Sequence, residues 1–307
     1  MLQMTRKAAE KIVSRELGGK ITGIKPLSKG NINKMYEISV KGTASKLILR
    51  LYNEAWKVDK EVYLYKLIKE SIGLPVPEVK FYDDTLSRFP FGYAILSKLP
   101  GAQLDKAYKK SHNKALFRAA GEALAKLHSI KFKSFGWIVG KEIRPSFRKW
   151  GDFVEHDIEH KLENIMAIGG IKTIAPHVRR FMEDNKALLR VRSGPSLLHK
   201  DYHPAHILTD SISVTGILDM EWAIAGHSEN DFIKMELWAF SGMPEARQEF
   251  FDGYIKFGDI SEEYSERRRV YELWHNVNMV SISHQIGNMK WLRTNMRQLE
   301  RFLHEHN

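Results

Sequence analysis

The spacing of apolar residues becomes mostly helical after residue 101, and this change limits the fold more than any other feature. Residues 20–52 contain short alternating apolar runs separated by turn sequences, which is the pattern of antiparallel strands. Two more strands are indicated at 78–83 and 91–99, and helical spacing occurs over 5–17 and 58–70. The N-terminal third is therefore expected to form a small sheet accompanied by helices.

After residue 101 the spacing is mostly helical, most clearly over residues 115–128. Helical spacing also covers 146–168, 176–191, 229–256 and 262–305. The exception is 195–220, where the runs HILTD and VTGILD flank a polar turn and predict a β-hairpin. We therefore predict an α+β chain with a small antiparallel-sheet lobe at 1–98 and a larger, mainly helical lobe at 99–307.

The composition favours a folded protein that works in water. Hydrophobic residues make up 43% of the 307 residues and charged residues 28%, and no apolar run approaches the roughly 18–20 residues of a membrane helix. The chain has no cysteine, which excludes disulfides, thiolate chemistry and cysteine-bound zinc. Because the first residues also differ from a secretory signal, we expect a cytoplasmic protein without a membrane partner.

The net charge of +11 indicates either an anionic partner or a solvated basic surface. Eight of these charges arise in residues 1–60, which hold 13 Lys and Arg against 5 Asp and Glu. We find no zinc-finger spacing, no aromatic RNA-binding pattern and no helix-turn-helix signature. The sequence therefore predicts no nucleic-acid partner, and the basic N-terminal lobe is better explained by a phosphate-bearing ligand.

The predicted hairpin carries the densest group of chemically active residues. One carboxylate and three imidazoles lie within eight residues, and Asp219 and Glu221 follow the hairpin's second strand. Pairing of the two strands would bring Asp201 and His206 to one edge together with Asp219. Two carboxylates and a nitrogen ligand in a polar loop can hold a divalent metal or orient a hydroxyl group for attack.

This loop resembles a known family. The pattern H-x-D-x-x-x-x-N followed by an apolar strand and I-x-D is similar to the catalytic loop and metal-binding aspartate of the protein-kinase-like fold. The His-Pro inside the loop resembles the aminoglycoside phosphotransferase and choline kinase superfamily. The segment ILDMEWAIAGHSENDF is also similar to that family's tail, at Asp219, Glu221, Gly226 and Asp231. The resemblance spans residues 20–240.

The resemblance implies a role for each loop residue. Asp201 would be the catalytic aspartate that orients the acceptor hydroxyl, and Asp219 would coordinate Mg²⁺ at the nucleotide phosphates. His206 stands where the family usually has a metal-binding Asn, as it does in some macrolide and aminoglycoside phosphotransferases. Imidazole is a poorer ligand for Mg²⁺ than oxygen.

The resemblance also places the nucleotide, ATP or GTP, in the N-terminal lobe. Arg50 occupies the position of the kinase strand lysine, and Glu61 that of its paired glutamate, so we predict an Arg50–Glu61 ion pair. The phosphate-covering loop would include Ser28, Gly30 and Asn31, although one glycine also suits an ordinary hairpin turn. The purine base would bind the backbone at Ser97 and Leu99, where no side chain selects between adenine and guanine.

A metal-dependent hydrolase is the main alternative, because His199, Asp201, His203 and His206 resemble a zinc ligand set. It leaves the Gly30, Arg50 and Glu61 series unexplained. In the kinase interpretation, His199 instead bonds backbone near Asp219. A nucleotide-binding module without activity is a further alternative, which the presence of both Asp201 and Asp219 disfavours.

The acceptor has no motif of its own, so an antibiotic and a metabolite alcohol both stay open. We expect residues 130–192 and 240–300 to build its pocket. A polycationic aminoglycoside would need acidic walls, for which the chain offers Glu229, Asp231, Glu236, Glu245, Glu249 and Asp252, residues that also suit a solvated helix face. A macrolide would need aromatic walls, for which it offers Phe147, Trp150, Phe153 and Trp238.

Overall fold

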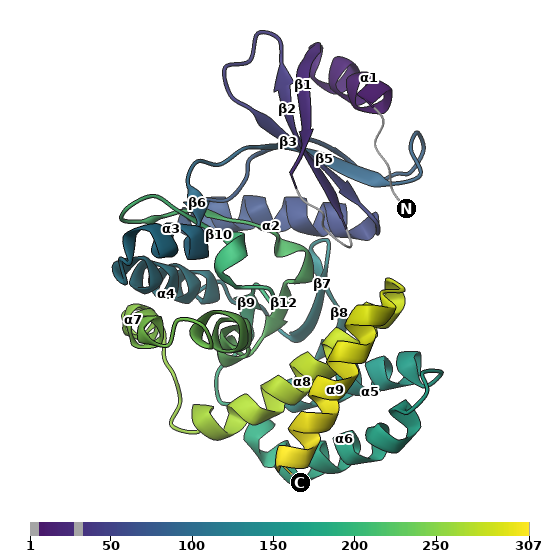
Figure 1. The fold of residues 1–307 in the computed structure, drawn as a ribbon, viewed down its shortest axis with the longest axis vertical. Coiled ribbons are helices and arrows are strands. Elements are labelled where there is room, and N and C mark those ends of the chain that lie inside the picture. The colour runs from purple at the N-terminus through teal and green to yellow at the C-terminus, as the bar shows by residue number, and fades with distance from the viewer. Residues whose placement is uncertain (1–5, 28–32, 307) are drawn as a thin grey trace.

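The computed structural model describes residues 6–27 and 33–306 and has the predicted α+β, two-lobed architecture. Figure 1 shows a sheet lobe at one end and a helical lobe at the other, with a layer of short strands between them. The five strands of the first sheet are β1 (Ile21–Pro26), β2 (Lys34–Val40), β3 (Leu47–Tyr52), β4 (Val79–Asp83) and β5 (Gly92–Ser97). They pair antiparallel in the order β1-β2-β3-β5-β4, which confirms the predicted meander.

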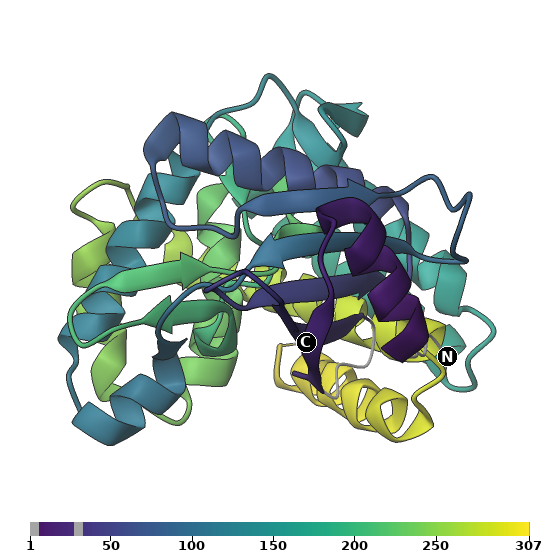
Figure 2. The ribbon, with the colours of Figure 1, turned by 90° about the horizontal axis from the view of Figure 1, so that it is seen from above.

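Strand alternation decides what each face of this sheet contacts. Helix α1 (Arg6–Leu17) shares an apolar cluster with Leu49 and Leu51 of β3. Helix α2 (Trp56–Ile72) shares another cluster with Tyr52. Since side chains two positions apart lie on the same face of a strand, Arg50 is on the α2 side. In Figure 2, helix α1 (purple) crosses in front of the strands, and α2 (blue) lies beside them toward the top of the view.

The second lobe is built mainly from helices. They are α3 (Leu104–Ser111), α4 (Ala115–His128), α5 (Trp150–Ile165), α6 (Ile171–Asn185), α7 (Glu245–Tyr254), α8 (Tyr264–Gln285) and α9 (Met289–His306). Trp150, Phe153 and Trp274 are fully or almost fully buried between α5 and α8. No helix in the described part of the chain combines the length and the apolar composition needed to cross a membrane.

Helices α4 and α7 pack unusually closely. A Cβ atom added at Gly121 of α4 would lie 2.0 Å from the Phe250 carbonyl oxygen, and one added at Gly253 of α7 would lie 2.0 Å from the Arg118 carbonyl oxygen. Only glycine permits this backbone contact. The two glycines thus allow the backbones of α4 and α7 to approach this closely.

The second lobe contains more strands than the single hairpin that we predicted. The hairpin of β10 (Ile207–Thr209) and β11 (Val214–Ile217) is present and is extended by β6 (Ala102–Gln103). A further sheet has the order β8-β7-β12-β9, from β7 (Phe135–Val139), β8 (Glu142–Phe147), β9 (Ser196–Leu198) and β12 (Ile224–Gly226). The helix expected from residue 146 therefore begins at Trp150, because the preceding residues pair with β7.

Candidate active site

The loop from His199 to His206 connects β9 with β10 and is fixed at its start by Asp231. The Asp231 carboxylate accepts the backbone N–H groups of His199 and Lys200, both at 2.6 Å. It also lies 3.1 Å from Nε2 of the buried His128. Lys200 has a φ of 65°, a left-handed conformation that is uncommon for residues other than glycine. The carboxylate thus holds the backbone turn that aims the next residue, Asp201.

His199 has a structural role, as the kinase interpretation predicted. Its Nε2 atom lies 2.8 Å from the Leu218 carbonyl oxygen, next to Asp219, and its Nδ1 atom accepts the Asp201 backbone N–H at 3.2 Å. Burial lowers the pKa of His199. Both ring nitrogens are therefore engaged, which removes His199 from the zinc ligand set that the hydrolase alternative required.

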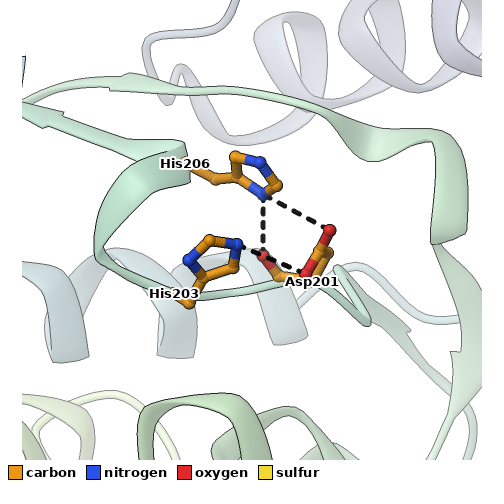
Figure 3. A group of neighbouring side chains, drawn as sticks. All are labelled: Asp201, His203 and His206. Atoms are coloured by element: carbon orange, nitrogen blue, oxygen red, sulfur yellow. Dashed lines mark hydrogen bonds and ion pairs between the residues drawn. The ribbon is translucent and has the colours of Figure 1, made fainter. Parts of the chain in front are cut away.

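Asp201, His203 and His206 converge at the centre of the loop, as Figure 3 shows. Nε2 of His203 and Nδ1 of His206 each lie 3.5 Å from an Asp201 carboxylate oxygen. Nδ1 of His206 also lies 3.0 Å from the Asp201 backbone oxygen. Ligand atoms of the three residues lie within 4.8 Å of one another. Both imidazoles therefore support the same carboxylate.

Lys234 is a site residue that the sequence analysis missed. Its ammonium group donates to Oδ1 of Asp201 from a segment 33 positions further along the chain. Burial works against the charge of Asp201, but Lys234 and the two histidines outweigh it, and the pKa of Asp201 is held well below its usual range. Lys234 lies three residues after Asp231, so the family-like tail was the only signal that pointed to this segment.

The two carboxylates that lie eighteen positions apart in the sequence do converge. Nε2 of His206 is 3.7 Å from Oδ2 of Asp219, so the imidazole lies between Asp201 and Asp219. On its other side, Oδ1 of Asp219 accepts a hydrogen bond of 2.7 Å from Arg50. Asp219 has a φ of 66°, which asparagine and aspartate adopt more readily than most residues.

The predicted Arg50–Glu61 ion pair is confirmed, with Nη1 of Arg50 at 3.2 Å from Oε1 of Glu61. Glu61 is completely buried and accepts three further hydrogen bonds, from the hydroxyls of Tyr52 and Tyr65 and from the Met220 backbone N–H. Burial opposes the charge of Arg50, yet Asp219 and Glu61 outweigh it and raise the pKa of Arg50 well above its usual value. Arg50 therefore stays protonated inside the protein.

Glu221 and Asn33 add a second connection between the lobes. Nδ2 of Asn33 donates to Oε2 of Glu221 at 2.5 Å, and Arg50 approaches the same oxygen at 3.5 Å. Burial and the neighbouring Asp219 raise the pKa of Glu221 to about 6. Asn33 is the last residue of the segment 27–33 that resembles the phosphate-covering loop, but its contact with Glu221 was not predicted.

The remaining predicted nucleotide residues are less informative. Ser97 ends strand β5, where its hydroxyl accepts the Glu78 backbone N–H at 2.9 Å, and Leu99 follows as a half-buried residue. Neither has a hydrogen bond or ion pair to the Arg50–Asp219 group among the described residues. Ser28, Gly30 and Asn31 lie outside the described residues, between the ends of β1 and β2.

A cavity of about 530 Å³ opens beside the loop from His199 to His206, of which Lys200 lines it. Its walls include Trp137, His156 and Met279, which come from the two ranges where we expected the acceptor pocket. The aromatic walls differ from those we expected. Trp150 and Phe153 belong to the buried core, because α5 turns that face toward α8, and the cavity is instead lined by Trp56, Trp137 and Trp222.

The six acidic residues that were considered as pocket walls for a polycationic acceptor also lie away from the cavity. Glu229 pairs with Arg267, and Glu236 pairs with Arg247 at 2.7 Å. Asp231 binds the loop backbone as described above. None of the six acids lines the cavity in the described part of the chain.

The donor atoms of Asp219 and His206 can be tested against a divalent cation. Two atoms that bind one Mg²⁺ ion at about 2.1 Å lie roughly 3 to 4 Å apart. Oδ2 of Asp219 and Nε2 of His206 are 3.7 Å apart, and Oδ2 accepts no hydrogen bond from the described residues. Asp219 supplies the oxygen that Mg²⁺ prefers, whereas the imidazole is a weaker match. The pair therefore fits the ion, with Asp219 as the principal ligand.

Comparison with known proteins identifies the family. A sequence profile described as the phosphotransferase enzyme family matches residues 23–271. The chain belongs to this family and is therefore a small-molecule phosphotransferase by class. It is 28% identical over 231 residues to a probable ketoamine kinase of Vibrio cholerae, which covers 72% of this chain and 73% of the relative. A probable ketoamine kinase of Vibrio parahaemolyticus is 27% identical, covering 82% of this chain and 84% of the relative.

Solved structures share the whole fold at low sequence identity. A thermostable mutant of the aminoglycoside phosphotransferase APH(4)-Ia has a TM-score of 0.77 and 18% identity, covering 96% of this chain and 98% of its own. A putative fructosamine-3-kinase from Haemophilus somnus has a TM-score of 0.71 and 16% identity, covering 97% of both chains. These likenesses confirm the two-lobed kinase-like fold.

Proposed function

We propose that this protein transfers the γ-phosphoryl group of ATP or GTP to a hydroxyl group of a small molecule. One observation carries the proposal: a continuous set of contacts runs from Glu61 through Arg50, Asp219 and His206 to Asp201. It joins the sheet lobe, which we assign to nucleotide binding at 1–98, to the catalytic and acceptor-binding lobe at 99–307. The family and the ketoamine kinase relatives support the same class of reaction.

In the proposed reaction, Asp201 receives the proton of the acceptor. The hydroxyl oxygen attacks the γ-phosphorus, the bond from that phosphorus to the bridging β-phosphate oxygen breaks, and the nucleoside diphosphate leaves. The lowered pKa of Asp201 keeps its carboxylate ionised at neutral pH. His203, His206 and Lys234 hold the carboxylate from three directions, so the protein positions the acceptor at little additional entropic cost.

The nucleotide phosphates would lie at Arg50, which Glu61 orients from the opposite side. The segment containing Ser28, Gly30 and Asn31 would cover the phosphates, and the backbone at Ser97 and Leu99 would bind the base. Structural neighbours were solved with AMP-PNP and hygromycin B in one case and with GDP and kanamycin in another. Both purine nucleotides are therefore candidates for this chain.

Asp219 and His206 would hold Mg²⁺. The carboxyl group of Glu221 lies 3.5 Å from Arg50, so its protonation state changes the net charge beside these residues. When bound, the ion would neutralise negative charge on the phosphate oxygens. Arg50 contributes fixed positive charge at the same place, since its raised pKa keeps it protonated under all ordinary conditions.

A nucleotide-consumption screen tests the proposal. ATP and GTP are offered with Mg²⁺ and a panel of aminoglycosides, macrolides, choline, sugars and hydroxy amino acids, and release of the nucleoside diphosphate is measured. Asp201→Asn keeps the shape of the side chain but loses the base, so acceptor-dependent turnover should fall by about a thousandfold. Asp184→Asn, at a solvent-exposed residue of α6, is the matched control and should retain full turnover. Undiminished turnover in Asp201→Asn would exclude Asp201 from the mechanism.

A further inference from the structure

The cavity beside the catalytic loop has the size and position of an acceptor site. Its volume of about 530 Å³ falls within the range of small-molecule pockets. Lys234 lines it and also contacts the Asp201 carboxylate, and Lys200 lines it and precedes Asp201 in the chain. A molecule bound in this cavity would therefore lie beside Asp201. The inference below rests on the proposed function, because it concerns the acceptor of that reaction.

The charged groups on the cavity wall are predominantly basic. Five side chains are basic and two are acidic: Lys57, Arg144, Lys161, Lys200 and Lys234 against Glu54 and Asp157. Two of the bases pair with acids outside this set, Arg144 with Glu142 and Lys234 with Asp201. Both acids already have partners on the wall. Glu54 pairs with Lys57 at 2.7 Å, and Asp157 pairs with Lys161.

Asp157 is the deeper of the two acids, and its carboxylate is fully used. Besides Lys161, it accepts the indole N–H groups of Trp137 at 2.9 Å and of Trp274 at 2.6 Å. These donors, together with Lys161, lower the pKa of Asp157 although burial works in the opposite direction. Asp157 is therefore not available to bind an ammonium group of a polycationic acceptor, and Glu54 already pairs with Lys57.

Lys200 is the cavity cation without a compensating acid. Its amine lies 3.3 Å from the centroid of the Trp274 ring, and no carboxylate oxygen among the described residues comes within 4 Å of it. Lys60 adds a second uncompensated amine just behind the wall. It is completely buried, its Nζ atom has no hydrogen-bond partner among the described residues, and it lies 5.5 and 5.3 Å from the rings of Trp56 and Trp137.

Indole rings form the rest of the wall. Trp137 and Trp222 contact each other edge to face at a centroid separation of 6.5 Å, and Lys57 lies 3.9 Å from the centre of the Trp222 ring. Such surfaces pack against a ring or another flat apolar body. The wall therefore combines aromatic surface with one amine, that of Lys200, that has no carboxylate partner within 4 Å among the described residues.

We propose that the acceptor is a hydroxyl compound that carries a carboxylate or phosphate group on a flat or ring-shaped body, and that polycationic aminoglycosides are excluded. The anionic group would bind the Lys200 amine, and the body would pack on Trp137 and Trp222. In either protonation state the Lys200 amine offers N–H donors, and a bound anion would form charge-assisted hydrogen bonds with it.

Four probes test this inference by calorimetry on the full chain, because they share a benzyl alcohol and differ in the para substituent that sets their charge. They are para-(hydroxymethyl)benzoate, para-(hydroxymethyl)phenyl phosphate, para-(hydroxymethyl)benzamide and para-(aminomethyl)benzyl alcohol. At least one anionic probe should bind about tenfold more tightly than the amide, with the amine weakest. The two anionic arms distinguish a carboxylate from a phosphate acceptor. Equal binding of all four, tighter binding of the amine, or no binding of either anion at millimolar concentration would overturn the inference.

Two variants locate the preference in the cavity. Lys200→Met should abolish the tenfold advantage, whereas Lys109→Met, which removes an exposed charge of α3 away from the cavity, should leave it unchanged. Should Lys200→Met fail to fold, Arg144→Met at the exposed cavity rim should reduce the advantage about threefold. An unchanged preference in the folded cavity variant would overturn the inference.

Titration of the same samples with Mg-ATP and Mg-GTP separates this inference from the proposed function. Anion preference without uptake of either nucleotide would refute the kinase proposal. If a nucleotide binds but the cavity binds the amine probe more tightly than the anionic probes, the kinase proposal stands and the proposed anionic class of acceptor is refuted.

Discussion

Asp231→Asn should disable the catalytic loop without unfolding the protein. The Asp231 carboxylate accepts the backbone N–H groups of His199 and Lys200 and lies against His128. The two backbone N–H groups are donors, and the His128 ring can act as one. An asparagine side chain has only one accepting oxygen, so it can accept hydrogen bonds from only some of these groups. One position of the new side chain becomes NH₂ and faces a backbone N–H at a site that is nearly closed to solvent.

The magnitude follows from these contacts. A buried N–H without an acceptor costs about 1–3 kcal/mol, and the remaining bonds lose roughly 1 kcal/mol more because the acceptor is no longer charged. The sum is about 3 kcal/mol, which is smaller than the roughly 5–15 kcal/mol stability of a typical domain. The loop would relax from the left-handed turn at Lys200 and displace Asp201. A displacement of about 1 Å lowers turnover by about a hundredfold.

Urea unfolding and steady-state turnover measure the two effects on one sample. Asp184→Asn removes an equivalent charge from the surface of α6 and should change neither quantity. A free energy of unfolding within about 0.5 kcal/mol of the parent, together with undiminished turnover, would refute the role assigned to Asp231.

Three further predictions test other parts of the structure. Burial lowers the pKa of His227 to about 3 from 6.5, so the unfolded chain binds the proton first as pH falls. The stability contributed by neutral His227 is present above pH 6.5, and about 1 kcal/mol of it should be lost between pH 7 and 5.5. Urea titrations should show a smaller loss in His227→Asn. The same pH dependence of the unfolding free energy in parent and variant would contradict this prediction. Gly121→Ala should cost about 2 kcal/mol by thermal unfolding, because its Cβ would lie 2.0 Å from a carbonyl oxygen. Gly169→Ala, with nothing within 4 Å, should be nearly neutral, and equal effects would argue against close α4–α7 packing. Glu61→Gln should destabilise the fold by about 3 kcal/mol and weaken nucleotide binding in calorimetry, and an unchanged nucleotide Kd would separate Glu61 from the phosphate site.

The parts of the site that the sequence predicted are those governed by local spacing. The family resemblance implied the Arg50–Glu61 pair, and the local structure accounts for it: Arg50 is on the α2 face of β3, and Glu61 lies one turn into α2. The convergence of Asp201 and Asp219 likewise follows from one hairpin, whose strands pair Ile207 with Ile217.

The parts that the sequence did not predict depend on long-range packing. Lys234 reaches Asp201 only because the chain returns through β12, and no spacing rule connects the two residues. The aromatic residues considered for a macrolide wall lie away from the cavity for a related reason. Aromatic residues suit both a core and a ligand cavity, and only the packing of α5 against α8 turns Trp150 inward while leaving Trp137 beside the cavity.

The small sheet of the second lobe was missed because its strands are short. Strands β9 and β12 have three residues each, too few to display an alternating pattern. Strand β8 contains Pro145 and is largely exposed, so its residues lack the apolar alternation of a buried strand.

Calorimetric titration of Mg-ATP and Mg-GTP into the parent protein and into Asp219→Asn tests the kinase proposal most directly. Asparagine also tolerates the left-handed backbone at this position, so the variant should fold while losing the charge that binds Arg50 and the metal ion. We predict saturable uptake of at least one nucleotide by the parent, dependence of that uptake on Mg²⁺, and its weakening by about tenfold or more in Asp219→Asn. Absence of uptake of both nucleotides by the parent, or identical binding by the variant, would contradict the proposed phosphoryl transfer at this site.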